Sequence, residues 1–200
     1  MIHPDTKLKF IDPQIGYGVF ATAFIPVGTI VYISDALDIE ISPDSDLLYD
    51  PCYQNIIKKY CVVEPDGKRV LSWDIARYVN HCCRYNTIST GYGFEIAVRN
   101  IEAGEQITDD YGIFNLEENI NLICHFQDCR KQVRASDFDK YGPAWDKDIK
   151  FALTRLQDVS QPLLKFMDSE TYESLMNYLK TGTDYRSVSL LKYCRQVESG

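Results

Sequence analysis

The chain lacks any apolar run that approaches the roughly 20 residues needed to cross a bilayer, and no apolar segment resembling a signal peptide opens it. It also lacks an excess of basic residues: 21 Lys and Arg stand against 29 Asp and Glu, a formal net charge of −8. A general nucleic-acid binder would need a concentrated basic face. These absences predict a protein without a membrane span and without direct nucleic-acid binding.

The chain holds seven cysteines, an odd number. Without a signal peptide, reduced thiols are the simpler interpretation of such a set, so we expect an intracellular protein, cytoplasmic or nuclear. Two hundred residues suffice for one domain, alone or with an appendage. A chain of this length buries a sizeable core without disulfides.

Most of the negative charge lies in residues 1–112, which hold 9 Lys and Arg against 16 Asp and Glu. An acidic surface suits a basic partner. Six acids follow one another there without an intervening Lys or Arg: Asp35, Asp38, Glu40, Asp44, Asp46 and Asp50. This acidic run is either a solvated loop or a docking surface for a basic peptide.

The first 112 residues predict short strands, because Val, Ile, Tyr and Phe cluster between Gly, Pro and Asp. The predicted strands are 7–11, 17–24, 29–33, 60–64, 68–71, 94–101 and 106–108. The clearest turn is Glu64-Pro65-Asp66-Gly67, between two apolar runs. After residue 130 helical spacing predicts two amphipathic helices, 145–160 and 169–181, the second capped by Asp168 or Ser169 and ended at Gly182.

Three ordered segments carry the strongest signal. Residues 16–21 read GYGVFA and are followed by IPVG at 25–28, residues 77–86 read RYVNHCCRYN, and residues 104–112 read GEQITDDYG. Together they resemble the SET-domain protein lysine methyltransferases, whose motifs are G-x-G-[VL]-x-A…G, R-[FY]-[IV]-N-H-S-C-x-P-N and G-E-E-[LI]-T-x-D-Y-G. The resemblance covers about residues 7–130.

The resemblance implies a mainly β fold with appended helices: a SET β-clasp around a threaded, pseudoknot-like active site, with a C-terminal helical segment. The SET domain core would span residues 7–112, with an insertion at about 35–59. A post-SET-like segment, 113–130, would follow. Residues 131–200 would form a helical appendage, as one wall of the peptide groove or a lid.

The resemblance also implies S-adenosylmethionine-dependent methyl transfer to a lysine side chain of a protein, with histones as the familiar substrates. The main chain of Gly16, Tyr17 and Gly18 and the Asn80 side chain would hold the methionyl end of the cofactor. An Asn side chain offers both a donor and an acceptor to a zwitterionic amino acid. The His81 main chain would pair with the adenine edge, and Tyr111 would lie beside the methyl group.

Tyr111 is the predicted catalytic residue. Free lysine has a pKa of about 10.4, so the amine must lose its proton before it attacks. A narrow apolar channel favours the neutral amine by desolvation. A phenol with a pKa of about 10 is a poor base at neutral pH, so we expect Tyr111 to orient the amine rather than deprotonate it.

Three differences from the family bear on the site. Cys82 replaces the usual Ser, Tyr85 the usual Pro, and Asp109 stands where the family often has Phe or Tyr facing the lysine pocket. As a substrate-pocket residue, Asp109 would pair with the incoming ammonium or point away to solvent. The product, mono-, di- or trimethyl-lysine, stays open. Two alternatives stay open as well: a catalytically weak SET-like module that binds basic peptides, and a methyltransferase for a non-lysine or small-molecule acceptor.

Many relatives close the active site with C-x-C-x4-C and complete a zinc site with the cysteine of N-H-S-C. The corresponding thiols here are Cys83, Cys124 and Cys129, and Leu122 occupies the position of the missing cysteine. Three thiolates would need His125 or an outside ligand to complete a tetrahedral zinc site. The sequence therefore predicts no zinc, with the cysteines packed as small apolar side chains.

Overall fold

The computed structural model describes residues 1–124 and 126–193. The strands are β1 (Thr6–Asp12), β2 (Gly16–Ala21), β3 (Ile30–Ile33), β4 (Ile39–Ile41), β5 (Cys61–Val63), β6 (Arg69–Leu71), β7 (Asn80–His81), β8 (Thr87–Ser89), β9 (Phe94–Ala97), β10 (Thr108–Asp109), β11 (Ile120–Asn121) and β12 (Gln132–Val133). The α-helices are α1 (Pro51–Tyr60), α2 (Asp137–Leu153) and α3 (Ser169–Thr181). Among the described residues, every helix is too short or too polar to span a bilayer.

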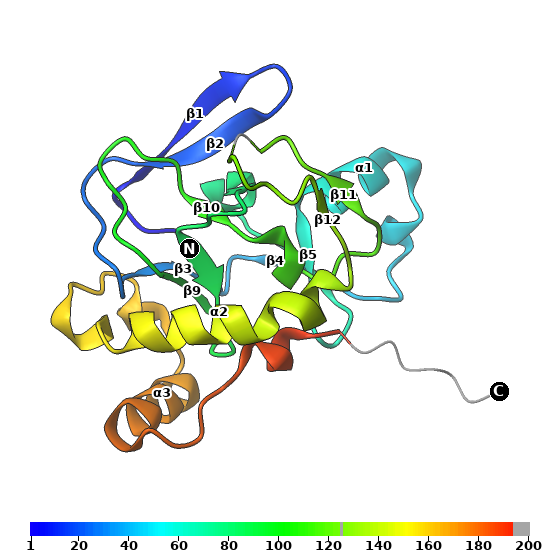
Figure 1. Cartoon of the computed structure of the whole chain (residues 1–200). Coiled ribbons are helices and arrows are strands. Elements are labelled where there is room, and N and C mark those ends of the chain that lie inside the picture. The colour runs from blue at the N-terminus through cyan, green and yellow to red at the C-terminus, as the bar shows by residue number, and fades with distance from the viewer. Residues whose placement is uncertain (125, 194–200) are drawn as a thin grey trace.

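The strands form several small sheets instead of one large one (Figure 1). β1 and β2 make an antiparallel hairpin, and β3–β9–β8 and β4–β6–β5 are antiparallel three-stranded sheets. β11 pairs with β12, also antiparallel. The prediction of a mainly β fold with helices is confirmed.

A parallel pair, β7 with β10, joins two motif segments that are distant in the sequence. Asn80 lies beside Thr108, and His81 beside Asp109. The buried Asn86 side chain, from the segment after β7, bonds to the β10 segment: its Nδ2 donates to the Gln106 carbonyl at 2.8 Å, and its Oδ1 accepts from the Thr108 N–H at 2.8 Å. The side-chain amide thus satisfies backbone groups that strands of two residues leave without partners.

The predicted turn at 64–67 is present between β5 and β6, with Gly67 at φ +86°. The insertion holds β4 and the unpredicted helix α1. α1 begins after Asp50, whose carboxylate accepts from the Cys52 N–H at 2.8 Å. Ile57 is the one buried residue of α1, so the apolar period that would predict a helix is missing.

Both predicted C-terminal helices are present. α3 has the predicted bounds, with Asp168 accepting from the Thr171 N–H at 2.9 Å and Gly182 in the left-handed conformation at φ +75°. α2 starts and ends earlier than the predicted 145–160 and contains Pro143. A proline usually ends or kinks a helix, and the apolar pattern begins only after it.

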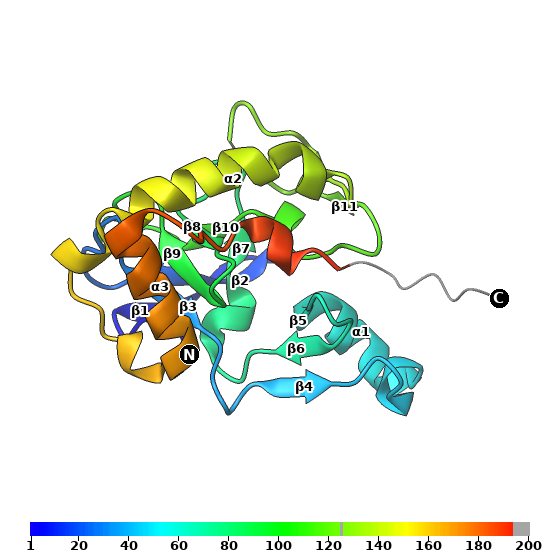
Figure 2. The same ribbon diagram turned by 90° about the horizontal axis from the view of Figure 1, so that it is seen from below.

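α2 is part of the core. Its buried face carries Phe138, Trp145, Ile149 and Leu153, which pack in the larger of two apolar clusters with residues of β3, β8 and β9. Both ribbon views show α2 lying over β9 (Figures 1 and 2). The smaller cluster is formed by Ile2, Val19, Ala21, Ile25, Val31, Ala97, Ile101 and Ile107. The helical segment therefore supports the sheet from which the site is built.

Gly28 lies where the loop before β3 meets the end of α2. Its φ is +90°, and a Cβ there would come within 2.8 Å of the Arg155 main chain. Gly104 has a similar φ of +86°, but a Cβ there would meet nothing within 4 Å.

Gly104→Ala should cost about 1 kcal/mol of the free energy of unfolding through backbone strain. Gly28→Ala should cost about 1–3 kcal/mol more through overpacking. Urea unfolding measures both, and equal losses would contradict this account of Gly28.

Candidate active site

The motif segments meet at a pocket of about 690 Å³, which we call the cofactor pocket. Its lining includes Gly16, Tyr17, Asn80, His81 and Tyr111, all of which the sequence placed at the cofactor. Gly18 is not among the lining residues. The part of the wall that lies outside the motif segments comes from Gln14, Ile15 and Arg99, from the end of α1, and from residues 120–124 and 126. The volume suits a ligand of small-molecule size.

Gly18 serves packing within the protein. A Cβ at this position would come within 2.9 Å of the Asn80 amide nitrogen and 2.6 Å of that of Gln106. The Asn80 Nδ2 donates to the Tyr17 carbonyl at 2.9 Å. The missing side chain of Gly18 therefore lets Asn80 reach β2, and the contact of the Gly18 main chain with the cofactor stays a prediction.

The His81 side chain contacts both the turn at Tyr111 and the Cys83 thiol. Its side chain is 4% exposed, and burial lowers the pKa of the imidazole to about 4. The ring is therefore neutral near pH 7. Its Nδ1 accepts from the Tyr111 N–H at 3.1 Å, so the proton is assigned to Nε2, which lies 3.3 Å from the Cys83 sulfur.

Tyr111 opens a short 3-10 helix, Tyr111–Ile113. Its hydroxyl donates to the Val79 carbonyl at 2.9 Å, and its ring lies against His81 and Phe114, with centroid distances of 5.5 and 5.9 Å. Burial raises the pKa of the phenol above its usual value, and the Asp109 charge raises it further. Tyr111 is thus a fixed, neutral phenol that can orient a ligand.

Asp110 holds this turn in place. Its Oδ1 accepts from the Gly112 N–H at 2.9 Å and pairs with Arg130, and its Oδ2 accepts from the Trp145 indole at 3.2 Å. The motif contains Asp110, but the sequence analysis assigns no role to Asp110 or Arg130, and no local pattern indicates the contact with Trp145.

Asp109 is completely buried, at 0% exposure. The alternative that it points to solvent is therefore wrong. Asp109 does not line the cofactor pocket, nor a second pocket that residues of the insertion, β5, β6 and β9 line. Its Oδ2 has no hydrogen-bond partner among the described residues. Burial, followed by the nearby Glu95 carboxylate, raises the pKa of Asp109 well above its usual range.

The three candidate thiols come together beside the cofactor pocket. The sulfurs of Cys83, Cys124 and Cys129 all lie within 4.8 Å of one another, and those of Cys83 and Cys129 are 3.7 Å apart. Leu122 lies in the pocket wall, and His125 lies outside the described residues. A structural zinc site takes four ligands, so these thiols supply three of the four positions.

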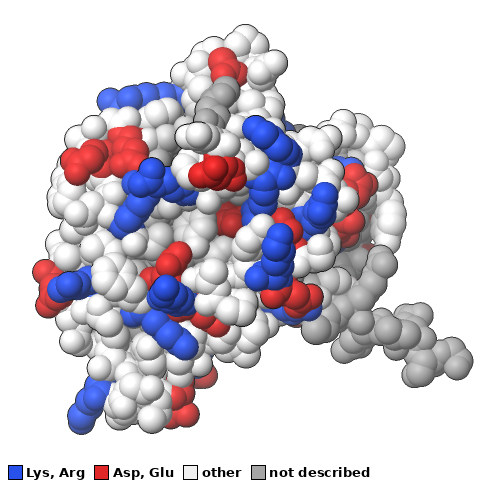
Figure 3. Space-filling model, viewed as in Figure 1, with Lys and Arg blue, Asp and Glu red and all other residues white. Residues whose placement is uncertain are grey.

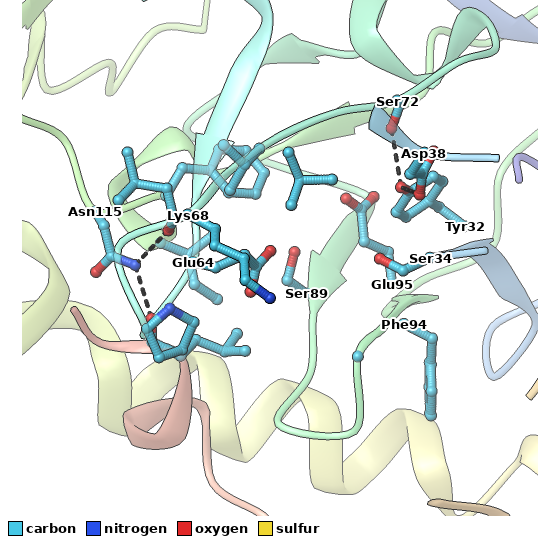
Figure 4. Close-up of a pocket in the computed structure, with 18 of the residues that line it drawn as sticks. Tyr32, Ser34, Asp38, Glu64, Lys68, Ser72, Ser89, Phe94, Glu95 and Asn115 are labelled. Atoms are coloured by element: carbon cyan, nitrogen blue, oxygen red, sulfur yellow. Dashed lines mark hydrogen bonds between the residues drawn. The ribbon is translucent and has the colours of Figure 1, made fainter. Parts of the chain in front are cut away.

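A second pocket of about 530 Å³, the acidic pocket, is lined by residues of the insertion, β5, β6 and β9 (Figure 4). Its acidic residues are Asp35, Asp38, Glu40, Glu64, Asp66 and Glu95, against one basic residue, Lys68. The first half of the acidic run thus lies in this pocket. The second half, Asp44, Asp46 and Asp50, does not line it, and Asp50 instead caps α1.

The two pockets have opposite charge. The charged lining of the cofactor pocket is basic: Lys58, Lys59, Arg77, Arg84 and Arg99. On the face seen in Figure 3, by contrast, Lys and Arg are interspersed with Asp and Glu. The separation of charge is therefore a property of the pockets. A ligand with an anionic group fits the first pocket, and a cationic ligand fits the second.

The matched family is the SET domain, whose model covers residues 16–112. Among curated proteins, the Histone-lysine N-methyltransferase trithorax of Drosophila melanogaster is 30% identical over 131 residues, which make up 59% of this chain and 3% of that protein. The chain thus corresponds to a small part of that relative's length.

Two solved structures are similar at lower identity. The methyltransferase domain of human Histone-lysine N-methyltransferase SETMAR is 17% identical with a TM-score of 0.45, over 67% of this chain and 58% of that chain. KRYPTONITE, solved in complex with mCHG DNA and SAH, is 19% identical with a TM-score of 0.44, over 64% of this chain and 29% of that chain.

The region matched by the family model contains β2, the parallel pair of β7 with β10, and the turn at Tyr111. These elements supply the motif residues of the cofactor pocket. Residues 16–112, slightly under half of the chain, therefore match the SET domain, and over this region the chain is similar to SET-domain proteins.

Proposed function

We propose that this chain transfers a methyl group from S-adenosylmethionine to a lysine side chain of a protein. The observation that carries the proposal is the cofactor pocket, in which Asn80, His81 and Tyr111 meet. The curated relative is named as a histone-lysine methyltransferase, which supports lysine as the acceptor. A histone tail is one basic segment of the kind that the acidic pocket suits.

When bound, S-adenosylmethionine would supply an activated methyl group on its sulfonium. In the proposal its amino-acid end lies at Asn80, whose Nδ2 is engaged by Tyr17 and whose Oδ1 can accept from an ammonium. The basic side chains of the pocket suit the carboxylate. The rings of Tyr60 and Tyr78 also line the pocket and offer flat apolar surfaces to a purine, beside the His81 main chain.

Tyr111 would act on the acceptor amine. Its hydroxyl donates to Val79, so its oxygen can accept a hydrogen bond from an amine N–H and direct the nitrogen lone pair. The raised pKa keeps the phenol protonated, so the hydroxyl orients the nucleophile without taking its proton. Removal of the amine proton must therefore be accomplished by another group.

Substitutions at Tyr111 and Asn80 should separate catalysis from cofactor binding. Tyr111→Phe should keep cofactor affinity and lower single-turnover methylation by about 10²–10³, the order that loss of one preorganised hydrogen-bonding group costs, because the hydroxyl oxygen that orients the amine is removed. Asn80→Ala should weaken cofactor affinity by about 1–3 kcal/mol, or roughly one to two decades. Calorimetry and mass spectrometry of methylated peptides measure the two effects. Well-folded wild-type protein that binds no S-adenosylmethionine would refute the proposed function.

The acidic pocket should attract basic peptide through Glu40 and Asp66, exposed side chains that both contact Lys68. Glu40→Gln combined with Asp66→Asn should raise the peptide KM at low salt and flatten its salt dependence. Exposed pairs contribute only about 0–1 kcal/mol each, so we expect a change of a few-fold. Asp44→Asn combined with Asp46→Asn removes the same charge away from the pocket. An equal rise in KM in this control would show that only net charge matters.

We expect purified protein to hold less than one zinc per chain, because the described residues supply three clustered thiols and structural zinc takes four ligands. Plasma emission spectrometry measures the metal content. Cys52→Ser is the matched control, since Cys52 is exposed and lies outside the cluster. One zinc per chain in wild type and in Cys52→Ser, lost in Cys124→Ser, would show the expectation to be wrong.

A further inference from the structure

One carboxylate beside the catalytic turn lacks the polar partners that its burial demands. The Asp109 Oδ1 accepts from the Asp110 N–H, but its Oδ2 meets no donor among the described residues. Burying an ionised carboxylate without such partners is costly. The group that lies against it is a second carboxyl, that of Glu95.

Glu95 links this buried group to the acidic pocket. It lies in β9, opposite Tyr32 of β3 and Ser89 of β8, and it lines the pocket. Figure 4 shows its carboxylate directed into the pocket, between the side chains of Ser89 and Tyr32. One member of the carboxyl pair is therefore accessible to a ligand, whereas the other lies in the interior.

Two facing carboxylates offer only acceptors unless a proton lies between them. Burial raises the pKa of Glu95 to about 7 and that of Asp109 well above its usual range. Two such groups titrate as a pair rather than singly. Because two facing like charges repel, one ionised and one protonated carboxyl is the arrangement that the geometry favours.

The pair also lies beside the residue proposed to orient the amine. Asp109 is two residues from Tyr111, and both carboxyl charges raise the pKa of the Tyr111 phenol, after the larger effect of burial. Tyr111 lines the cofactor pocket and Glu95 lines the acidic pocket. Asp109 lines neither pocket but neighbours a lining residue of each.

We propose that the Glu95–Asp109 carboxyl pair receives the ammonium group of the target lysine and takes its proton. The inference rests on the proposed lysine methylation. The ammonium brings one positive charge to a pair with one negative charge. Proton transfer then replaces two buried charges with neutral groups, which a site of low dielectric favours.

In this step one lysine N–H bond breaks, one carboxyl O–H bond forms, and the nitrogen keeps the electron pair. The neutral nitrogen then forms the N–CH₃ bond while the S–CH₃ bond breaks and its electron pair leaves with sulfur. The positive charge passes from the sulfonium to the methylated ammonium. The carboxyl pair returns its extra proton to solvent through the acidic pocket.

Several titratable groups face the pair and contribute to its pH dependence. They are the hydroxyls of Tyr85 and Tyr111, the Asp110 carboxylate and the amino group of Met1. Burial raises the pKa of both phenols above its usual value, so both stay neutral near pH 7. Neither phenol therefore contributes a kinetic transition near neutral pH.

The test compares Asp109→Asn and Glu95→Gln with wild type and with Glu173→Gln, an exposed residue of α3. The probes are a synthetic library of basic peptides centred on lysine and the same library with γ-thialysine, whose amine is more acidic. Both pair variants should lower kcat/KM for lysine roughly 10²-fold at neutral pH, the order of a general base. The loss in kcat/KM should be smaller at higher pH and smaller for the γ-thialysine library, because in both cases more of the amine is already neutral. Cofactor affinity and the Glu173→Gln variant should match wild type.

Unfolding provides a readout that needs no substrate. The folded-state pKa of Asp109 is raised above its unfolded value, so folding takes up a proton and stability falls as pH rises between the two values. Asn cannot titrate. The urea midpoint should therefore fall less steeply with pH for Asp109→Asn than for wild type or Glu173→Gln.

The outcomes separate this inference from the proposed function. If wild type methylates lysine peptides and both pair variants keep its pH profile and kcat/KM, the inference is overturned and the proposed function stands. If wild type binds S-adenosylmethionine but methylates no lysine peptide at any pH, the proposed function fails and the inference with it. If Asp109→Asn does not fold, the Glu95→Gln variant, whose substitution lies at the pocket lining, tests the inference through the same pH profile and kcat/KM.

Discussion

The position of the turn at Tyr111–Ile113 depends on one buried carboxylate, that of Asp110. It accepts from the Gly112 N–H of its own turn and from Trp145 of α2, and it pairs with Arg130 of the segment that carries the C-x4-C cysteines. A buried charge is stable only when it is paired and hydrogen-bonded. The turn, the helix and the segment must therefore assemble together. α2 is tied to the site in this way although none of its residues lines the cofactor pocket.

The net charge of the chain conceals two pockets of opposite sign. The cofactor pocket has only basic charged side chains in its lining, and the acidic pocket has a single Lys68 against six acids. Tyr111 belongs to the first pocket, and its neighbours Ile113 and Phe114 belong to the second. A cofactor with a carboxylate and a cationic acceptor are thus each attracted to a different side of one short turn. In the proposed function this arrangement keeps the acceptor from competing for the cofactor site.

The motifs predicted five residues of the cofactor pocket, Gly16, Tyr17, Asn80, His81 and Tyr111, because they are contiguous stretches whose order is itself informative. Turn and cap chemistry likewise predicted the β5–β6 turn and both ends of α3. The sequence does not predict helix α1, because Ile57 is its one buried residue and no apolar period indicates a helix. The partners of Asp110 lie 20 and 35 residues away, at Arg130 and Trp145. Contacts between residues so far apart in the sequence depend on tertiary packing, and no local sequence pattern predicts them.

Asp109 shows where local pattern and fold disagree. At a fully buried position an apolar residue would stabilise the protein more than a carboxylate whose pKa must rise for the chain to fold. Its charged state is disfavoured further because β8, β9 and β10 bring the Glu95 carboxyl against it. Conflicts of this kind between residue and environment concentrate at functional sites. Tyr111 is held as a neutral phenol, so a separate group must deprotonate the amine, and the buried carboxyl pair is the group in position to do so.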